Sequence, residues 1–192
     1  MEKVKGWWFT TTNKKLANGD NRKIIKGRTH KVKGEIIPCE RGLHLSRRII
    51  DALQYASGPV IYRVEGRGII IPHGNPVDKY VCSERTYLAG GVDITQILRK
   101  YARLCALDVI DLWDAPDIVI QYLRTGDETI RDAARAAARA AAWAAAWDAA
   151  WDAAMAAARD AAIAAARDAA RAAAIKKQNT RLTSMIMAAR RK

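Results

Sequence analysis

The pattern of apolar and polar positions changes near residue 91. Before it, short runs rich in aromatic and β-branched residues alternate with turn signals, which is typical of strands and tight connections. A short helix with Ser46 as its N-cap is predicted to run to about Tyr55. We therefore predict a mixed α+β unit over residues 1–91, with strands near 5–11, 29–38, 60–65, 69–72 and 80–88.

After Gly90-Gly91 the apolar residues recur at helical spacing. Asp93 is a candidate cap for a helix to about Trp113, and Pro116 begins the next helix. The predicted fold class is α+β: a small N-terminal mixed domain, then connecting helices and a long alanine-rich helical region. The expected boundaries are 1–91 for the basic domain, 92–125 for the connecting helices, 126–176 for the alanine-rich region and 177–192 for a basic helix or tail.

From Arg131 to Ile175 one large residue stands at every fourth position, and 28 of the other 33 residues are alanine. Alanine has the highest helix propensity. A step of four exceeds the 3.6-residue turn by about 40°, so the stripe winds around a helix and does not line one face. A coherent apolar patch is expected only over Trp143, Trp147, Trp151 and Met155. We expect this patch to be buried against the N-terminal unit or against another copy in a homo-oligomer, and one long helix or several shorter ones both fit the pattern.

The positive charge lies at the two ends of the chain. The net charge is +13, of which residues 1–92 contribute +9 and residues 176–192 contribute +6. Basic surfaces attract nucleic acid, nucleotides and acidic proteins. Lys26 and Arg28 belong to a dense basic stretch, and Trp7 and Trp8 are candidate stacking platforms. The stretch fits a solvated charged hairpin, and the alternative is an anion-binding surface.

The cysteines and the termini predict the compartment. Cys39, Cys82 and Cys105 are odd in number and widely spaced, and no apolar signal segment opens the chain, which is typical of a reducing cytosol. No charge-free apolar run is long enough to span a membrane, so no membrane partner is expected. A metal site drawn from Cys39, His44, His73 and Cys82 lacks the spacing of compact ligand pairs, so neither metal nor cofactor is expected.

The segment Cys39–Ser46 (Cys-Glu-Arg-Gly-Leu-His-Leu-Ser) is the best local candidate for chemistry. His44 leaves a strand just before Ser46, and Tyr55 and Glu65 follow. This order loosely resembles ADP-ribosyltransferase folds. The resemblance implies binding of a nicotinamide dinucleotide and a glutamate that stabilises a cationic transition state. The paired Glu-x-Glu of many members is missing, and the structural alternative makes Ser46 a helix cap and His44 a half-buried residue.

The same segment, followed by Asp-Ala-Leu-x-Tyr-Ala at 51–56 and Tyr-Arg-Val-Glu at 62–65, resembles an uncharacterised domain of phage and prophage proteins. Members continue into helices like 104–116 and then carry an Ala/Trp/Arg/Asp repeat. The resemblance covers most of the chain. It implies a viral accessory gene and no particular activity.

The leading hypothesis is a non-enzymatic phage accessory protein in the host cytosol. It would act against a defence component by binding an anionic small molecule such as a nucleotide signal, nucleic acid, or a host defence protein. The alternatives are an ADP-ribosyltransferase-like enzyme that uses His44, Tyr55 and Glu65, and a structural assembly protein. The expected ligand-binding residues are Trp7, Trp8, Lys26, Arg28, His44, Ser46 and Arg63.

Overall fold

The computed structural model describes the backbone of residues 2–16, 20–156 and 160–189, with their side chains except those of 147–169. The chain forms two compact units. Unit 1 comprises Met1–Ile97 and Asn179–Lys192, and unit 2 comprises Leu98–Gln178. An antiparallel sheet together with helices confirms the α+β fold class.

The sheet of unit 1 has the order β1-β4-β5-β2, and β3 also pairs with β5. The predicted strands at 60–65 and 69–72 are one long strand, and the predicted boundary at Gly90-Gly91 lies inside another. Both differences have one cause: the pairing register shifts at Gly68 and at Gly90-Gly91, so the chain bulges there and does not turn. The strands are β1 (Val4–Thr10), β2 (Thr29–Lys31), β3 (Leu43–Leu45), β4 (Val60–His73) and β5 (Lys79–Asp93).

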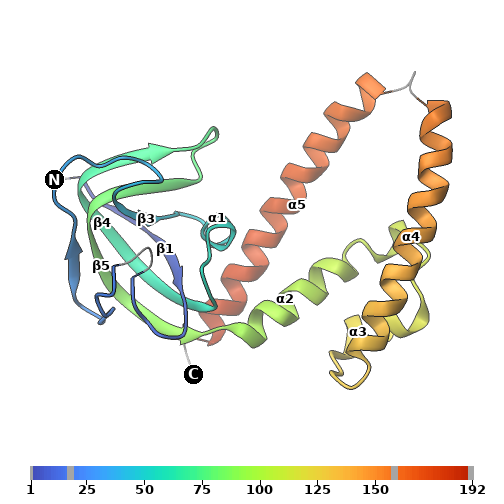
Figure 1. Ribbon diagram of the computed structural model, residues 1–192, viewed down its shortest axis with the longest axis horizontal. Coiled ribbons are helices and arrows are strands. Elements are labelled where there is room, and N and C mark those ends of the chain that lie inside the picture. The colour runs from blue at the N-terminus through green and yellow to red at the C-terminus, as the bar shows by residue number, and fades with distance from the viewer. Residues whose placement is uncertain (1, 17–19, 157–159, 190–192) are drawn as a thin grey trace. The chain divides into compact units, whose positions relative to one another are not determined.

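Backbone pairing joins the two ends of this path. Trp7 N donates to Ser46 O at 2.7 Å, and Ser46 N donates to Trp7 O at 3.0 Å. Because Ser46 directly follows β3, the strands β1, β4, β5 and β3 form a closed ring of hydrogen-bonded neighbours. Figure 1 shows β4 and β5 as the long, curved hairpin of this ring.

Alternation along the strands sends successive side chains to the inside and the outside of the ring. Trp8 packs with the interior cluster, whereas Trp7 lies on the outer face opposite Arg63. At Gly42, before β3, φ is 150° and a Cβ would collide with Val81 Cγ1, so the close approach of this loop to β5 requires glycine. The interior cluster includes Val4, Leu43, Leu45, Val60, Tyr62, Val64, Cys82 and Tyr87.

Two helices contribute to the outer part of unit 1: α1 (Ile49–Gln54) and the end of α5 (Asp160–Ala189). The expected N-cap role of Ser46 is wrong, because the cap position is Arg48 and the Ser46 backbone pairs with β1. The amide of Ile50 at the start of α1 donates instead to Asn179 Oδ1 at 3.2 Å. A side chain of the predicted basic tail therefore satisfies a helix terminus far away in the sequence.

The basic tail itself is packed into unit 1. Leu182 and Ile186 of α5 are 0% and 1% exposed. Ile186 shares a small hollow with Trp7 and Ile61. The C-terminal segment therefore belongs to the outer layer of unit 1.

Unit 2 is helical. Asp93 caps the first helix as predicted, since its Oδ1 accepts from Thr95 N at 2.8 Å, but this helix ends at Leu107 and not near Trp113. Val119 and Ala134 are buried where the third and fourth helices pack together. The elements are α2 (Thr95–Leu107, of which residues 95–97 belong to unit 1), η1 (Ile110–Leu112), α3 (Asp117–Thr125), α4 (Arg131–Ala156) and the beginning of α5.

The predicted apolar patch of the alanine-rich region falls on α4. Trp143 is 71% exposed among the described residues of unit 2. Burial of the patch, against the N-terminal unit or against a second copy, stays a prediction. Trp147, Trp151 and Met155 lie outside the residues whose side chains the structure describes.

Over the described part of the chain, no helix combines the length and the apolar character that crossing a membrane requires.

Candidate ligand-binding site

A pocket of about 310 Å³ lies in unit 1 beside α1. We call it the α1 pocket. Trp7 comes from β1, His44 from β3 and Lys79 from the first position of β5, so three strands of the ring contribute to it. Its walls also include Trp8, Cys39, Ser46, Ala52 and Tyr55.

Lys79 is the cation of this pocket. Its side chain lies deep in the wall, because the residue is only 8% exposed. The ammonium Nζ lies 3.3 Å from Cys39 Sγ and 4.2 Å from the centre of the Tyr55 ring. Among the described residues, no carboxylate oxygen lies within the 4.0 Å ion-pair distance of Nζ. A buried ammonium without a carboxylate partner is energetically costly, so an anionic group in the pocket would stabilise it.

The nearest acid in the sequence, Asp78, is directed at another group. Tyr55 Oη donates to Asp78 Oδ2 at 2.5 Å. This hydrogen bond, together with partial burial and the Asp78 charge, raises the pKa of Tyr55 to about 12. Tyr55 therefore stays protonated at neutral pH and holds the Asp78 carboxylate.

His44 does not add a second positive charge. Burial, followed by the charges of Lys79 and Arg85, lowers its pKa to about 4. At neutral pH the imidazole is therefore uncharged and can offer one donor and one acceptor nitrogen.

Cys39 and His73 lie beside Lys79 at the edge of the α1 pocket. Cys39 is exposed, and its backbone has the positive φ of 70°. Its Sγ lies 3.9 Å from His73 Nε2. Residues 73 and 79 end β4 and begin β5, and Asp78 N donates to His73 O at 3.2 Å across this turn. The β4–β5 turn therefore presents an imidazole and an ammonium to one thiol.

The interior of the ring holds a second buried cation. Arg85 is 2% exposed, and its guanidinium lies 3.9 Å from the centre of the Trp8 ring. It donates to Tyr87 Oη at 2.9 Å and to the His44 carbonyl. Burial lowers its pKa. Because Arg85 covers one face of the Trp8 ring, Trp8 is a structural partner more than a stacking platform.

The structure brings part of the predicted ligand-binding set together. Trp7, Trp8, His44 and Ser46 all line the α1 pocket. Arg63 does not line it; the guanidinium lies over the Trp7 ring at 4.8 Å, on the outer face of the ring of strands.

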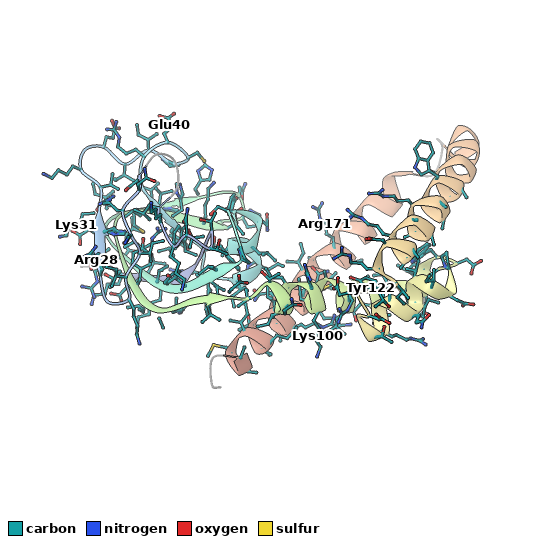
Figure 2. The ribbon with its side chains drawn as sticks, turned by 60° about the horizontal axis from the view of Figure 1, so that its bottom comes forward. Arg28, Lys31, Glu40, Lys100, Tyr122 and Arg171 are labelled. Carbon is teal, nitrogen blue, oxygen red and sulfur yellow. The ribbon has the colours of Figure 1, made fainter. Side chains whose placement is uncertain are left out.

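Lys26 and Arg28 stand elsewhere. Both are exposed at the turn before β2 and do not line the α1 pocket. Figure 2 shows Arg28 next to Lys31, on an edge of unit 1. The basic stretch is thus a surface feature, separate from the walls of the α1 pocket.

The structure does not bring together the three residues of the ADP-ribosyltransferase hypothesis. His44 and Tyr55 line the α1 pocket, but Glu65 does not. Glu65 is 5% exposed and accepts from Arg67 Nε at 2.6 Å. The hydrogen bond from Arg67 lowers the pKa of this carboxyl, so Glu65 is tied up as a structural ion pair.

Sequence reasoning missed Lys79 and the chemical setting of Cys39. Cys39 was visible as the first residue of the Cys39–Ser46 segment, yet nothing local marks it as the neighbour of His73. Lys79 is one of many lysines, and only its burial at the start of β5 distinguishes it. Cys82, considered with Cys39 for a metal site, is buried in the interior cluster.

No family model matches this chain, and neither the curated proteins nor the solved structures contain a match.

Proposed function

We propose that unit 1 binds a small organic anion in the α1 pocket, with Lys79 holding the anionic group. The observation that carries this proposal is the burial of the Lys79 ammonium in a pocket wall without a carboxylate partner among the described residues. The volume of about 310 Å³ is at the lower end of the range of small-molecule sites. Leu45 and Ala52 supply apolar wall for the uncharged part of the ligand.

The pocket suits a mononucleotide-sized ligand better than a nucleic-acid backbone. A polymer is held by many exposed cations along a surface. The α1 pocket offers one deep cation, with the half-exposed ring of Tyr55 as a planar wall for a base. The exposed basic residues near Lys26 and Arg28 would add long-range attraction for such an anion.

The biological setting of the proposal comes from the resemblance to phage and prophage proteins. Under this proposal the protein sequesters a nucleotide-like signal of a host defence pathway. The alanine-rich helices then mediate docking or self-association.

Isothermal titration of the full chain with adenosine monophosphate and with pyrophosphate tests the binding site. Lys79→Met should weaken binding about tenfold or more, because it removes a buried charged contact. Lys26→Met is the matched control, since it removes an exposed lysine of the same unit away from the pocket, and its affinity should stay within about twofold of the wild type.

Unchanged affinity in Lys79→Met would overturn the proposal. A short single-stranded oligonucleotide forms a third arm. If it binds more tightly than the mononucleotide, and Lys26→Met weakens it more than Lys79→Met does, the basic surface is a nucleic-acid site and the pocket is not the ligand site.

A further inference from the structure

Three groups at the edge of the α1 pocket form an arrangement that anion binding alone does not use. They are the thiol of Cys39, the ammonium of Lys79 at 3.3 Å and the imidazole of His73 at 3.9 Å. The thiolate is the nucleophilic form of cysteine, and a nearby base can accept the thiol proton as the sulfur attacks. The Sγ–Nε2 distance falls in the looser range found for nucleophile and base before a substrate is bound.

The exposure and the backbone conformation of Cys39 also indicate a functional role for its thiol. Cys39 is exposed and lines the pocket, so a bound molecule can reach its sulfur. Its φ of 70° is uncommon for a residue with a side chain, and such conformations concentrate at functional sites. Cys82 provides the contrast: it is buried, and burial raises the pKa of its thiol to about 11.

We propose that Cys39 is a nucleophile that accepts an acyl group from an acyl phosphate bound in the α1 pocket. The inference rests on the proposed anion site, because Lys79 would hold the phosphate group. The substrate class follows from the juxtaposition: the buried ammonium selects an anionic group, and the sulfur beside it needs an electrophilic carbon attached to that group.

The step balances without a further reactant. His73 Nε2 takes the proton of the Cys39 thiol, and the sulfur attacks the carbonyl carbon of the acyl phosphate. A C–S bond forms, the bond between the carbonyl carbon and the bridging oxygen breaks, and the electron pair leaves with the phosphate, which takes up the proton from His73. Lys79 stabilises the charge on the departing phosphate oxygen. The products are a Cys39 thioester and inorganic phosphate, and nothing is oxidised or reduced.

Acetyl phosphate is the probe, and intact-mass spectrometry with peptide mapping is the readout. The wild type should gain one acetyl group at Cys39 that neutral hydroxylamine removes, with release of phosphate. Cys39→Ser should gain none that hydroxylamine removes. His73→Gln should slow the reaction about tenfold or more, since it removes the base. Acetylation only at lysines, or a thioester that forms at the same rate in His73→Gln, would overturn the proposal.

Alkylation separates this inference from the proposed function. Iodoacetate is anionic and iodoacetamide is neutral, and both trap a reactive thiol. In the wild type Cys39 should react with iodoacetamide about tenfold faster than Cys105 in the same molecule. The ratio of the iodoacetate rate to the iodoacetamide rate should also be higher at Cys39 than for the free thiol of glutathione. Lys79→Met should abolish that preference for iodoacetate.

Equal rates at Cys39 and Cys105 overturn the inference and leave nucleotide binding by Lys79 intact. A fast Cys39 without any iodoacetate preference, in a protein that binds no nucleotide, overturns the anion site on which both proposals rest. Circular dichroism of each variant confirms that it is folded before its rates are compared.

Discussion

Leu182 and Trp143 are both large apolar residues on the alanine-rich and basic C-terminal half of the chain, and their environments are opposite. Leu182 lies in α5 and is 0% exposed, within unit 1. Trp143 lies in α4, within unit 2, and is 71% exposed. A tryptophan of the conspicuous repeat is thus exposed within its unit, while a leucine of the basic segment is fully buried within the other unit.

The difference shows that burial follows the partner surface more than the size or regularity of the side chains. Leu182 and Ile186 belong to the unit that contains the outer face of the ring, where Ile61 offers an apolar partner. Trp143 stands among alanines, which bury little area and leave a smooth helix. A regular stripe of large residues therefore predicts where the surface of a helix is apolar. It does not predict which surface, if any, covers that apolar patch.

The largest expected effect is at Leu182. Leu182→Ala should lower the free energy of unfolding of unit 1 by about 2 to 5 kcal/mol, because it leaves a cavity in a buried layer. Urea unfolding followed by tryptophan fluorescence measures this loss. Met187→Ala, at an exposed position of the same helix, is the control and should cost less than about 1 kcal/mol. Equal effects would mean that α5 does not pack into unit 1.

The next effect is a pH dependence that belongs to unit 1 alone. The folded pKa of His44 is about 4, below the ordinary 6.5, with Lys79, Arg85 and His73 facing it. The unfolded chain therefore binds a proton between these values that the folded chain does not, so stability falls as the pH falls from about 6.5 towards 4. The loss due to His44 is about 1 to 2 kcal/mol between pH 6.5 and 5.

His44→Gln should flatten this dependence in urea unfolding at a series of pH values, while retaining the part due to His30, whose pKa burial also lowers. An unchanged slope in His44→Gln would show that the imidazole is already solvated in the folded state.

The smallest effect on stability is expected at Trp143. Trp143→Ala should change the free energy of unfolding by about 0.5 kcal/mol or less, because the side chain is exposed. If a second copy covers the patch, the same substitution should lower the mass found by sedimentation equilibrium. Leu112→Ala removes another exposed apolar side chain of unit 2 and should leave the mass unchanged. The same mass for Trp143→Ala and the wild type would rule out docking through this residue.

Part of the α1 pocket could be predicted from the sequence. The Cys39–Ser46 segment and the aromatic pair at Trp7 and Trp8 indicated residues that line it. Lys79 could not be found in this way, because its importance comes from burial against Cys39 and Tyr55 on other elements. Arg28 shows the reverse error, since a dense basic stretch stands out in the sequence but lies outside the pocket.

The sequence by itself determined what depends on neighbours along the chain: the strand-rich first part, the helical remainder and the Asp93 cap. These follow from local propensity and from hydrogen bonds over a few residues. Only the tertiary structure decided that the pairing register shifts at Gly68 and at Gly90-Gly91, that Asn179 meets α1 and that a thiol, an imidazole and an ammonium lie together. Those contacts depend on the closure of the ring and on what it buries, and no local pattern of residues encodes either.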